Sequence, residues 1–423
     1  MKVYGDGDKM EAIPPSLGPG EVEHIIVFHD ESSFHTNDYQ SEYWLKPGEQ
    51  VLKKKDKGRL IMVSDFIIEE TGHIVLTEEL RRAQLSLPES ERLPDHARIV
   101  ICPTSKATGD SYWNMEQMTA QLKTVLQMLK ALYPNKKYVF IFDNSSAHNS
   151  LARDALTVTK MNVNPSGKQA HMHDTVIPET NPHGFGGQSQ SMQFPKELPQ
   201  DHKYFKYAGQ PKGIRVILEE RGLVRPSAKI VGVCKDCKVS RSRKPQIEGL
   251  SPAEEALIED EHVGDDTEEE EETRPKDCCM QRILSLQDDF RNEKSLLQKV
   301  IEEAGHVCLF LPKFHPELNP IEMYWGWAKR YFRERSNGDF HTALKLVHEA
   351  LNACPLITIR KFFQRVYRYM SAYGEGATGL LAEYAVKQYK SHRAITKTDL
   401  IQAEEKMKEQ EAKELTKGKD LAR

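Results

Sequence analysis

Three acidic residues, Asp30, Asp143 and Glu322, each come shortly after a run of apolar residues. Such a run is typical of a buried strand, so each carboxylate is expected where a central sheet meets water. Magnesium prefers hard oxygen ligands, keeps several waters and needs few protein carboxylates. Two such ions about 3.5–4 Å apart activate an attacking oxygen and stabilise the leaving oxygen in phosphoryl transfer. We therefore predict that the three carboxylates hold two Mg²⁺ or Mn²⁺ ions at one end of a sheet.

The surroundings of Glu322 predict that it lies in the first turn of a helix. Asn319 is a favourable N-cap residue, and Pro320 suits the first helical position, where no N–H is needed. Two roles are open for Glu322 when it is considered alone. It is either a metal ligand or a capping-box carboxylate that reaches back to the N–H of Asn319. The apolar residues behind it have helical spacing: Ile321, Trp325, Ala328 and Phe332.

The elements that must position these acids are those of an α/β protein with a mixed sheet. A strand at 23–29 is followed by strands at 58–68 and 72–76, an order that suits an antiparallel meander. A helix at 114–132 then crosses to the strand that ends at Asp143, and this strand–helix–strand pattern predicts a partly parallel sheet with flanking helices. A last strand at 307–311 and helical segments at 281–304 and 340–390 complete the pattern.

Three short motifs resemble those of a known family. They are His-Asp-Glu-Ser-Ser-Phe at 29–34, Asp-Asn-Ser-Ser-Ala-His at 143–148, and His-Pro-Glu-Leu-Asn-Pro-Ile-Glu-Met-Tyr-Trp at 315–325. Together and in this order they are similar to the three signatures of DDE transposases of the mariner-related superfamily, most of all to its fungal members. The resemblance covers roughly 20–160 and 275–395.

The resemblance implies an RNase H-like fold in which Asp30, Asp143 and Glu322 are the catalytic, metal-binding carboxylates. It implies metal-dependent cleavage of DNA at transposon ends, followed by strand transfer of the 3′-hydroxyl into target DNA. The implied partners are DNA and a second copy of the chain, since transposases of this kind act as dimers on paired ends. The implied location is the nucleus.

Composition divides the chain into segments. Residues 1–20 are rich in Gly and Pro, which predicts a linker, and 178 residues separate Asp143 from Glu322, which predicts a long insertion. The predicted segments are a linker at 1–20, the first part of the catalytic domain at 21–154, the insertion at 155–278, the second part at 279–336, a helical C-terminal region at 337–395 and a charged tail at 396–423.

The insertion contains four cysteines and an acidic run. Cys234 and Cys237 form a C-x-x-C pair, which is half of a zinc site, and Cys278 and Cys279 are adjacent. Adjacent cysteines rarely bind one tetrahedral ion together, so the alternatives are a structural Zn²⁺ and four reduced thiols in a loosely packed insertion. Residues 251–275 have no apolar residue after Val263, which predicts a disordered or solvated loop.

Charge along the chain is compatible with DNA as a partner. The net charge is −4, but it becomes +8 without the twelve acids between Glu254 and Glu272. A mildly basic remainder suits a phosphate backbone without being diagnostic of one. The alternative for each Lys or Arg candidate is a solvated surface position without a DNA contact. The alternative for His148 is an ordinary polar residue at the start of a helix. The candidates for DNA contact are Lys53, Lys54, Lys55, His148, Lys329, Arg330 and Arg333.

Two protein classes are excluded by composition. Seven cysteines in 423 residues do not make the disulfide framework of a secreted protein. There is no signal-peptide core and no apolar run near 18 residues, so we expect a soluble intracellular protein without a membrane span.

Two further functions remain open. The family normally has helix-turn-helix DNA-binding modules before its catalytic domain, and this chain begins too late to contain them. That departure favours a domesticated or decayed transposase that binds DNA or protein without catalysis, although the three acids argue against it. The other alternative is a stand-alone RNase H-like nuclease that cuts DNA without joining it.

Overall fold

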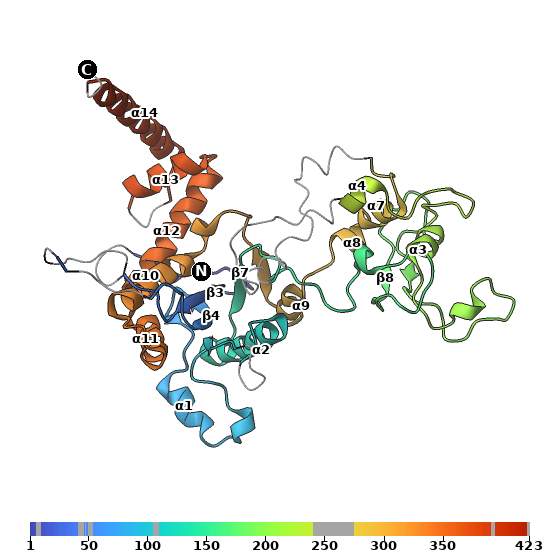
Figure 1. Cartoon of the computed structure of the whole chain (residues 1–423), viewed down its shortest axis with the longest axis horizontal. Helices are drawn as coiled ribbons and strands as arrows, with labels where there is room; N and C mark the ends of the chain where they lie inside the picture. The colour runs from blue at the N-terminus through green and yellow to red at the C-terminus, as the bar shows by residue number, and fades with distance from the viewer. Residues whose placement is uncertain are drawn as a thin grey trace. The chain divides into compact units, whose positions relative to one another are not determined.

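The computed structural model describes the 423-residue chain except for residues 6–9, 41–45, 47, 50–53, 105–109, 240–274, 391–393 and 421–423, and it leaves out the side chains of 238–239 and 411–420. The described residues form two compact units (Figure 1). The first unit consists of 1–144 and 300–423, and the second consists of 145–299. The predicted acidic loop at 251–275 lies almost wholly outside the described residues.

A mixed sheet forms the centre of the first unit. Its strand order is β10-β7-β3-β4-β5, with β6 paired to β4. The neighbours β10, β7 and β3 run parallel, whereas β4 is antiparallel to β3, β5 and β6. The predicted α/β class with a mixed, RNase H-like sheet is therefore confirmed. The strands are β3 (His24–His35), β4 (Leu60–Ile68), β5 (Gly72–His73), β6 (Ile99–Ile101), β7 (Lys137–Phe142) and β10 (Val307–Phe310).

Strand β3 is longer than predicted, so the expectation that Asp30 follows the end of its strand is wrong. The strand continues to His35 because β4 pairs with it through the polar stretch, with Asp30 opposite Asp65 and His35 opposite Leu60. The parallel partner β7 pairs with β3 only as far as Phe28. Asp30 thus lies within a strand, just beyond the end of its parallel neighbour.

Helix α2 (Met115–Leu132) covers one face of the sheet. Asn114 and Gln117 form a capping box at its start, which fixes the first turn. A buried polar chain joins the helix to the strands: Ser64 Oγ lies 2.9 Å from His29 Nε2 and donates to Gln121 Oε1 at 2.7 Å. Because buried polar groups are costly when unpaired, this chain favours one position of α2 over the sheet.

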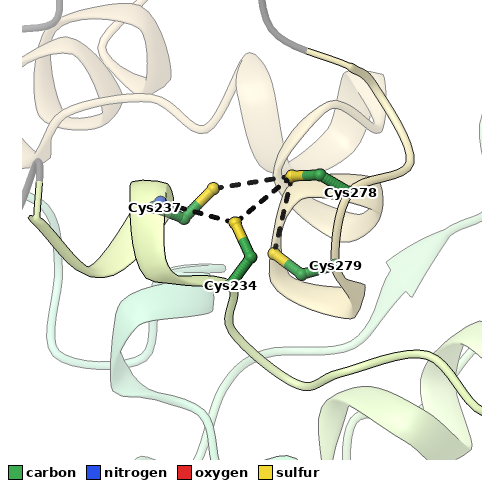
Figure 2. A group of neighbouring side chains, drawn as sticks. All are labelled: Cys234, Cys237, Cys278 and Cys279. Atoms are coloured by element: carbon green, nitrogen blue, oxygen red, sulfur yellow. Dashed lines mark hydrogen bonds between the residues drawn. The ribbon is translucent and has the colours of Figure 1, made fainter.

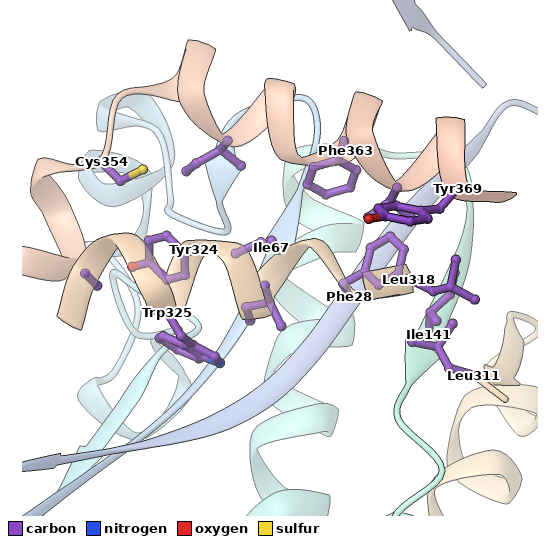
Figure 3. Close-up of a cluster of buried hydrophobic side chains, with 14 of the residues drawn as sticks. Phe28, Ile67, Ile141, Leu311, Leu318, Tyr324, Trp325, Cys354, Phe363 and Tyr369 are labelled. Atoms are coloured by element: carbon purple, nitrogen blue, oxygen red, sulfur yellow. The ribbon is translucent and has the colours of Figure 1, made fainter. Parts of the chain in front are cut away.

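Helices α10 (Pro320–Arg335), α11 (Phe340–Ala353) and α12 (Leu356–Gly374) cover the other face. Figure 3 shows the apolar core beneath them, in which Phe28 of β3 meets Phe363 of α12 with ring centroids 5.5 Å apart. Tyr324 and Trp325 of α10 are almost completely buried. Each such side chain contributes on the order of 1.5–3 kcal/mol through the apolar area it removes from water.

The first 20 residues, expected to be a linker, include a small sheet of β1 (Val3–Tyr4) and β2 (Ala12–Ile13). Gln364 of α12 donates a hydrogen bond to the carbonyl of Tyr4 at 3.0 Å, and Tyr4 is buried. The guanidinium of Arg360 lies 4.0 Å from the centre of the Tyr4 ring. These contacts attach the N-terminal segment to α12.

The remaining elements of the first unit are short, apart from α14. The predicted helical C-terminal region is present and extends into the charged tail. These elements are α1 (Glu78–Gln84), η1 (Glu89–Glu91), η4 (Pro316–Leu318), α13 (Gly379–Gln388) and α14 (Lys397–Asp420). Within the described ranges, no helix combines the length and apolar composition that crossing a bilayer requires.

The second unit has its own apolar core. Ile217 and Leu218 of α3 pack with Met280 and Leu284 of α7. The helix expected at 281–304 is divided into three, because turns interrupt it. The elements are η2 (Val158–Lys160), β8 (Thr175–Val176), β9 (Ser189–Gln190), η3 (Phe205–Tyr207), α3 (Ile214–Glu220), α4 (Lys235–Val239), α7 (Met280–Ser285), α8 (Asp288–Arg291) and α9 (Leu296–Glu303), the last of which continues into the first unit.

Glu69, the residue after β4, should make unfolding depend on pH. Burial raises the pKa of Glu69 from 4.5 to about 7, although the hydrogen bond from the Tyr367 hydroxyl (2.9 Å) opposes that rise. Because this folded-state pKa exceeds the unfolded value, the stabilisation is complete below about pH 4.5 and is lost as the pH rises through about 7. As the pH rises between these limits, we expect the free energy of unfolding of wild type to fall relative to that of Glu69→Gln. The difference should reach up to about 3 kcal/mol.

Urea unfolding near the two pH limits measures this difference. The exposed Glu78→Gln on α1 is the control and should follow the wild-type profile. Parallel profiles for wild type and Glu69→Gln would show that Glu69 does not contribute.

Candidate active site

Asp30 and Asp143 lie at the same level of neighbouring parallel strands. Phe28 of β3 is opposite Ile141 of β7, so two residues further along each chain Asp30 comes level with Asp143. Asp143 directly follows Phe142, the last residue of β7. Side chains alternate between the two faces of a sheet, and opposite residues share a face. Asp30 and Asp143 therefore belong to the face on which Phe28 and Ile141 contribute to the core under α10.

Asn319 fixes the start of α10 beside strand β3. Its Oδ1 accepts the N–H of Ile321 at 3.3 Å, and its Nδ2 donates to the carbonyl of His29 at 3.4 Å. The predicted N-cap and Pro320 at the first helical position are as expected. The capping-box role for Glu322 is wrong, because the N–H of Asn319 donates to the carbonyl of Pro316 at 3.0 Å. Glu322 thus lies in the first turn of a helix whose start is held beside His29, the residue that precedes Asp30.

Trp325 connects the same helix directly to Asp30. Its Nε1–H donates to Asp30 Oδ2 at 3.1 Å, and its side chain is almost completely buried. The sequence indicates only that Trp325 is one of the apolar residues at helical spacing behind Glu322. The signal that could have revealed its second role is its spacing: it follows Glu322 by three residues, so both lie on one side of α10. Trp325 therefore holds the Asp30 carboxylate from the helix that carries Glu322.

The three carboxylates act on one another electrostatically. Burial raises the pKa of Asp30 well above its usual value, and the negative charges of Glu31, Glu322 and Asp143 raise it further. Desolvation raises the pKa of Glu322, the positive charge of Lys329 lowers it, and the charge of Asp143 raises it. Like charges disfavour ionisation only at short range, so the fold brings the three predicted acids together.

The donor set fits a hard divalent cation. Its ligands are carboxylate oxygens, which Mg²⁺ and Mn²⁺ prefer. The positive charge of such an ion would also offset the repulsion among the carboxylates. Among the described residues, the three acids do not form a group whose ligand atoms all lie within 4.8 Å of one another. The structure thus supplies the oxygens and the excess negative charge, while a closed ligand shell is not preformed.

The basic candidates on α10 differ in their surroundings. Arg333 Nε lies 3.0 Å from both carboxylate oxygens of Asp38, so its charge is engaged in an ion pair. The ammonium of Lys329 lies 6.0 Å from the centre of the Phe34 ring, and Lys329 is partly buried. Arg330 is exposed. Of the three, Arg330 therefore has the position best suited to a phosphate backbone.

The other candidates lie apart from α10. Lys54 is exposed and donates to the carbonyl of Gly338 at 3.1 Å, Lys55 is exposed, and Lys53 is outside the described residues. His148 is buried, and its Nδ1 lies 3.1 Å from Ser145 Oγ. A role for these residues in DNA contact stays a prediction.

The structure also brings together the four cysteines of the predicted insertion. Cys234, Cys237, Cys278 and Cys279 offer sulfur atoms that all lie within 4.8 Å of one another (Figure 2). All four belong to the second unit, so this cluster is described separately from the carboxylates.

Part of the chain matches a known protein family. Residues 267–345 match the family model described as DDE superfamily endonuclease. The matched range includes β10 and α10, and hence Glu322, which supports a nuclease of the DDE superfamily. No curated protein matches the chain. Asp30 and Asp143 lie outside the matched range, and the strand register is what relates them to Glu322.

We expect Asn319 to affect metal binding at the site as well as the stability of the fold. Asn319→Ala removes a helix cap, which costs about 0.5–2 kcal/mol, and also the bond to His29 that fixes α10 beside Asp30. Asn114→Ala is the matched control, because it removes the cap of α2 on the other face. We expect both variants to lower the free energy of unfolding, and only Asn319→Ala to weaken Mn²⁺ binding. Calorimetric titration of folded protein measures the latter, and equal Mn²⁺ affinity in the two variants would contradict this role.

Proposed function

We propose that this chain contains the catalytic domain of a DDE transposase, which cuts DNA at transposon ends and joins the freed 3′-hydroxyl to target DNA. The observation that carries the proposal is the meeting of Asp30, Asp143 and Glu322 over one face of the sheet, where desolvation and then the charge of Asp143 raise the pKa values of Asp30 and Glu322. The match to the DDE superfamily endonuclease model, which includes Glu322, supports it independently.

In this mechanism no side chain acts as a nucleophile. Asp30 and Asp143 would share two Mg²⁺ or Mn²⁺ ions, and Glu322 would complete the set. When bound, such ions supply Lewis-acid stabilisation of the attacking and leaving oxygens. The hydrogen bond from Trp325 holds Asp30 in place, and the contact of Asn319 with the carbonyl of His29 positions the first turn of α10.

The bonds balance in each of the two steps. In the first, a water oxygen bonds to phosphorus while the bond from phosphorus to the 3′-oxygen breaks, which leaves a free 3′-hydroxyl. In the second, that 3′-hydroxyl bonds to a phosphorus of the target while the bond from this phosphorus to the 3′-oxygen of the target strand breaks, which leaves a free 3′-hydroxyl on the target. Each attacking group loses a proton to solvent and each leaving 3′-oxygen gains one. Because every P–O bond that breaks is replaced by a new P–O bond, neither step needs an external energy source.

The finer assignments belong to the same proposal. The three motifs support the mariner-related superfamily and, within it, the fungal members. That assignment carries with it transposon ends and target DNA as partners, a homodimer as the active form and the nucleus as the site of action.

The decisive prediction is metal-dependent cleavage of duplex DNA that requires all three acids. With Mg²⁺ or Mn²⁺ we expect wild type to cut end-labelled DNA, and EDTA to prevent it. Asp30→Asn, Asp143→Asn and Glu322→Gln should each abolish cutting, because each removes a negatively charged oxygen ligand. Glu334→Gln is the matched control, since Glu334 is an exposed acid near the other end of α10. Activity retained in any of the three variants would remove that residue from the site.

The same assay separates the alternatives. Joined products formed on target DNA support the transposase, whereas cleavage without joining indicates a stand-alone nuclease. A folded protein that binds DNA but cuts with neither metal would instead be a domesticated or decayed transposase that acts as a binding module.

The basic face of α10 yields a separate prediction about DNA binding. Arg330→Ala should weaken duplex binding similarly for all sequences and reduce the slope of log affinity against log salt by about one, because one phosphate contact is lost. Lys345→Ala, which removes an exposed cation on α11, is the control. Fluorescence anisotropy across a salt series measures both, and an unchanged slope in Arg330→Ala would exclude this contact.

A further inference from the structure

Four thiols from two distant stretches of the second unit converge around one point. Cys234 and Cys237 lie at α4, and Cys278 and Cys279 immediately precede α7. The Sγ of Cys278 lies 3.6 Å from that of Cys234, 3.7 Å from that of Cys237 and 4.0 Å from that of Cys279 (Figure 2). Although 40 residues separate Cys237 from Cys278 in the sequence, their thiols face one another.

The polypeptide itself brings the two pairs together. The N–H of Met280 donates to the carbonyl of Val231, and the N–H of Gln281 donates to that of Gly232, both at 3.0 Å. Met280 is completely buried in the core of the second unit. Gly232 also makes a close approach, because a Cβ atom there would lie 2.2 Å from a methyl group of Val163. The cysteines are therefore held by backbone hydrogen bonds and packing on both sides of the cluster.

The spacing of the sulfur atoms matches a tetrahedral thiolate site. A zinc ion with Zn–S bonds of about 2.3 Å places its sulfur ligands about 3.8 Å apart. The three distances from Cys278 Sγ, 3.6, 3.7 and 4.0 Å, lie on both sides of this value. None of the four thiols forms a disulfide in the structure. Adjacent cysteines counted against a shared ion in the sequence, but both Cys278 and Cys279 contribute to this cluster.

We propose that Cys234, Cys237, Cys278 and Cys279 bind one structural Zn²⁺. A site with four protein ligands leaves no open position for water or substrate, so its role is to stabilise the fold. Binding converts the thiols to thiolates and releases their protons to solvent. The ion would cross-link the Cys234–Cys237 pair to the Cys278–Cys279 pair, which 40 residues separate in the sequence, and a cross-link between distant residues restricts the unfolded chain.

The occupant follows from ligand chemistry. Four sulfur donors in tetrahedral arrangement select zinc or an iron–sulfur centre over Mg²⁺, Ca²⁺ or Mn²⁺, which prefer oxygen. The two sulfur-bound metals are distinguished by metal analysis and by colour, because Zn²⁺ has filled d orbitals and no visible absorption.

Metal content of the full-length protein, purified under reducing conditions with zinc in the medium, is the first measurement. We expect about one Zn per chain by mass spectrometry of the metals. Cys237→Ser and Cys278→Ser should each lose most of that zinc. Cys102→Ser, which removes a partly exposed thiol of the first unit, should keep it. Wild type without zinc, or zinc content unchanged in both cluster variants, would overturn the proposal, and bound iron would replace zinc as the occupant.

Titration of metal-free wild type with Co²⁺ keeps the test independent of whether the variants fold. Tetrahedral thiolate ligation should produce intense visible and thiolate-to-metal absorption bands that reach their maximum at one Co²⁺ per chain and disappear when Zn²⁺ is added. Their absence from folded, reduced protein would exclude the site. Neither measurement involves DNA or cleavage, so failure of the nuclease proposal leaves this one unaffected.

Discussion

The attachment of α10 to strand β3 is the interaction on which the candidate active site depends. Asn319 reaches the carbonyl of His29, and Trp325 reaches the carboxylate of Asp30, so two side chains of one helix fix it beside consecutive residues of one strand. Without this attachment, only apolar packing would set the position of Glu322 relative to Asp30. The helix N-terminus also favours a nearby negative charge, which partly offsets the repulsion among the acids.

Packing supplies the energy that keeps the acids together. Desolvation raises the pKa values of Asp30 and Glu322, and the negative charge of Asp143 raises both further, which costs stability when the two acids are ionised. The opposing contribution is the apolar face of α10, where Tyr324, Trp325 and Phe332 are buried. Three such side chains contribute several kcal/mol. The core beneath the helix can therefore tolerate an electrostatically unfavourable cluster at its edge, and a divalent cation would relieve that repulsion.

The second unit is stabilised by a small apolar core and a buried ion pair. It interrupts a sheet domain in the sequence and lacks a large sheet of its own among its described residues. Its core around Ile217 and Met280 is supported by the completely buried Arg221, which forms a two-point ion pair with Asp289 at 2.9 and 2.6 Å. Such a pair keeps a buried charge from being left uncompensated. The thiol cluster would add a cross-link where the chain enters and leaves residues 240–274.

The sequence by itself predicted most of the strands and helices and singled out the three candidate acids, because apolar periodicity, N-cap chemistry and motif order are local properties. It correctly placed Asp143 after a strand and Glu322 in the first turn of a helix. Only the tertiary structure decided that β3 continues past Asp30, since the extension requires pairing with β4. It alone revealed the bond from Trp325 and the meeting of adjacent cysteines with a distant C-x-x-C pair. These are contacts between residues far apart in the chain, and local sequence patterns do not specify which distant residue a side chain will contact.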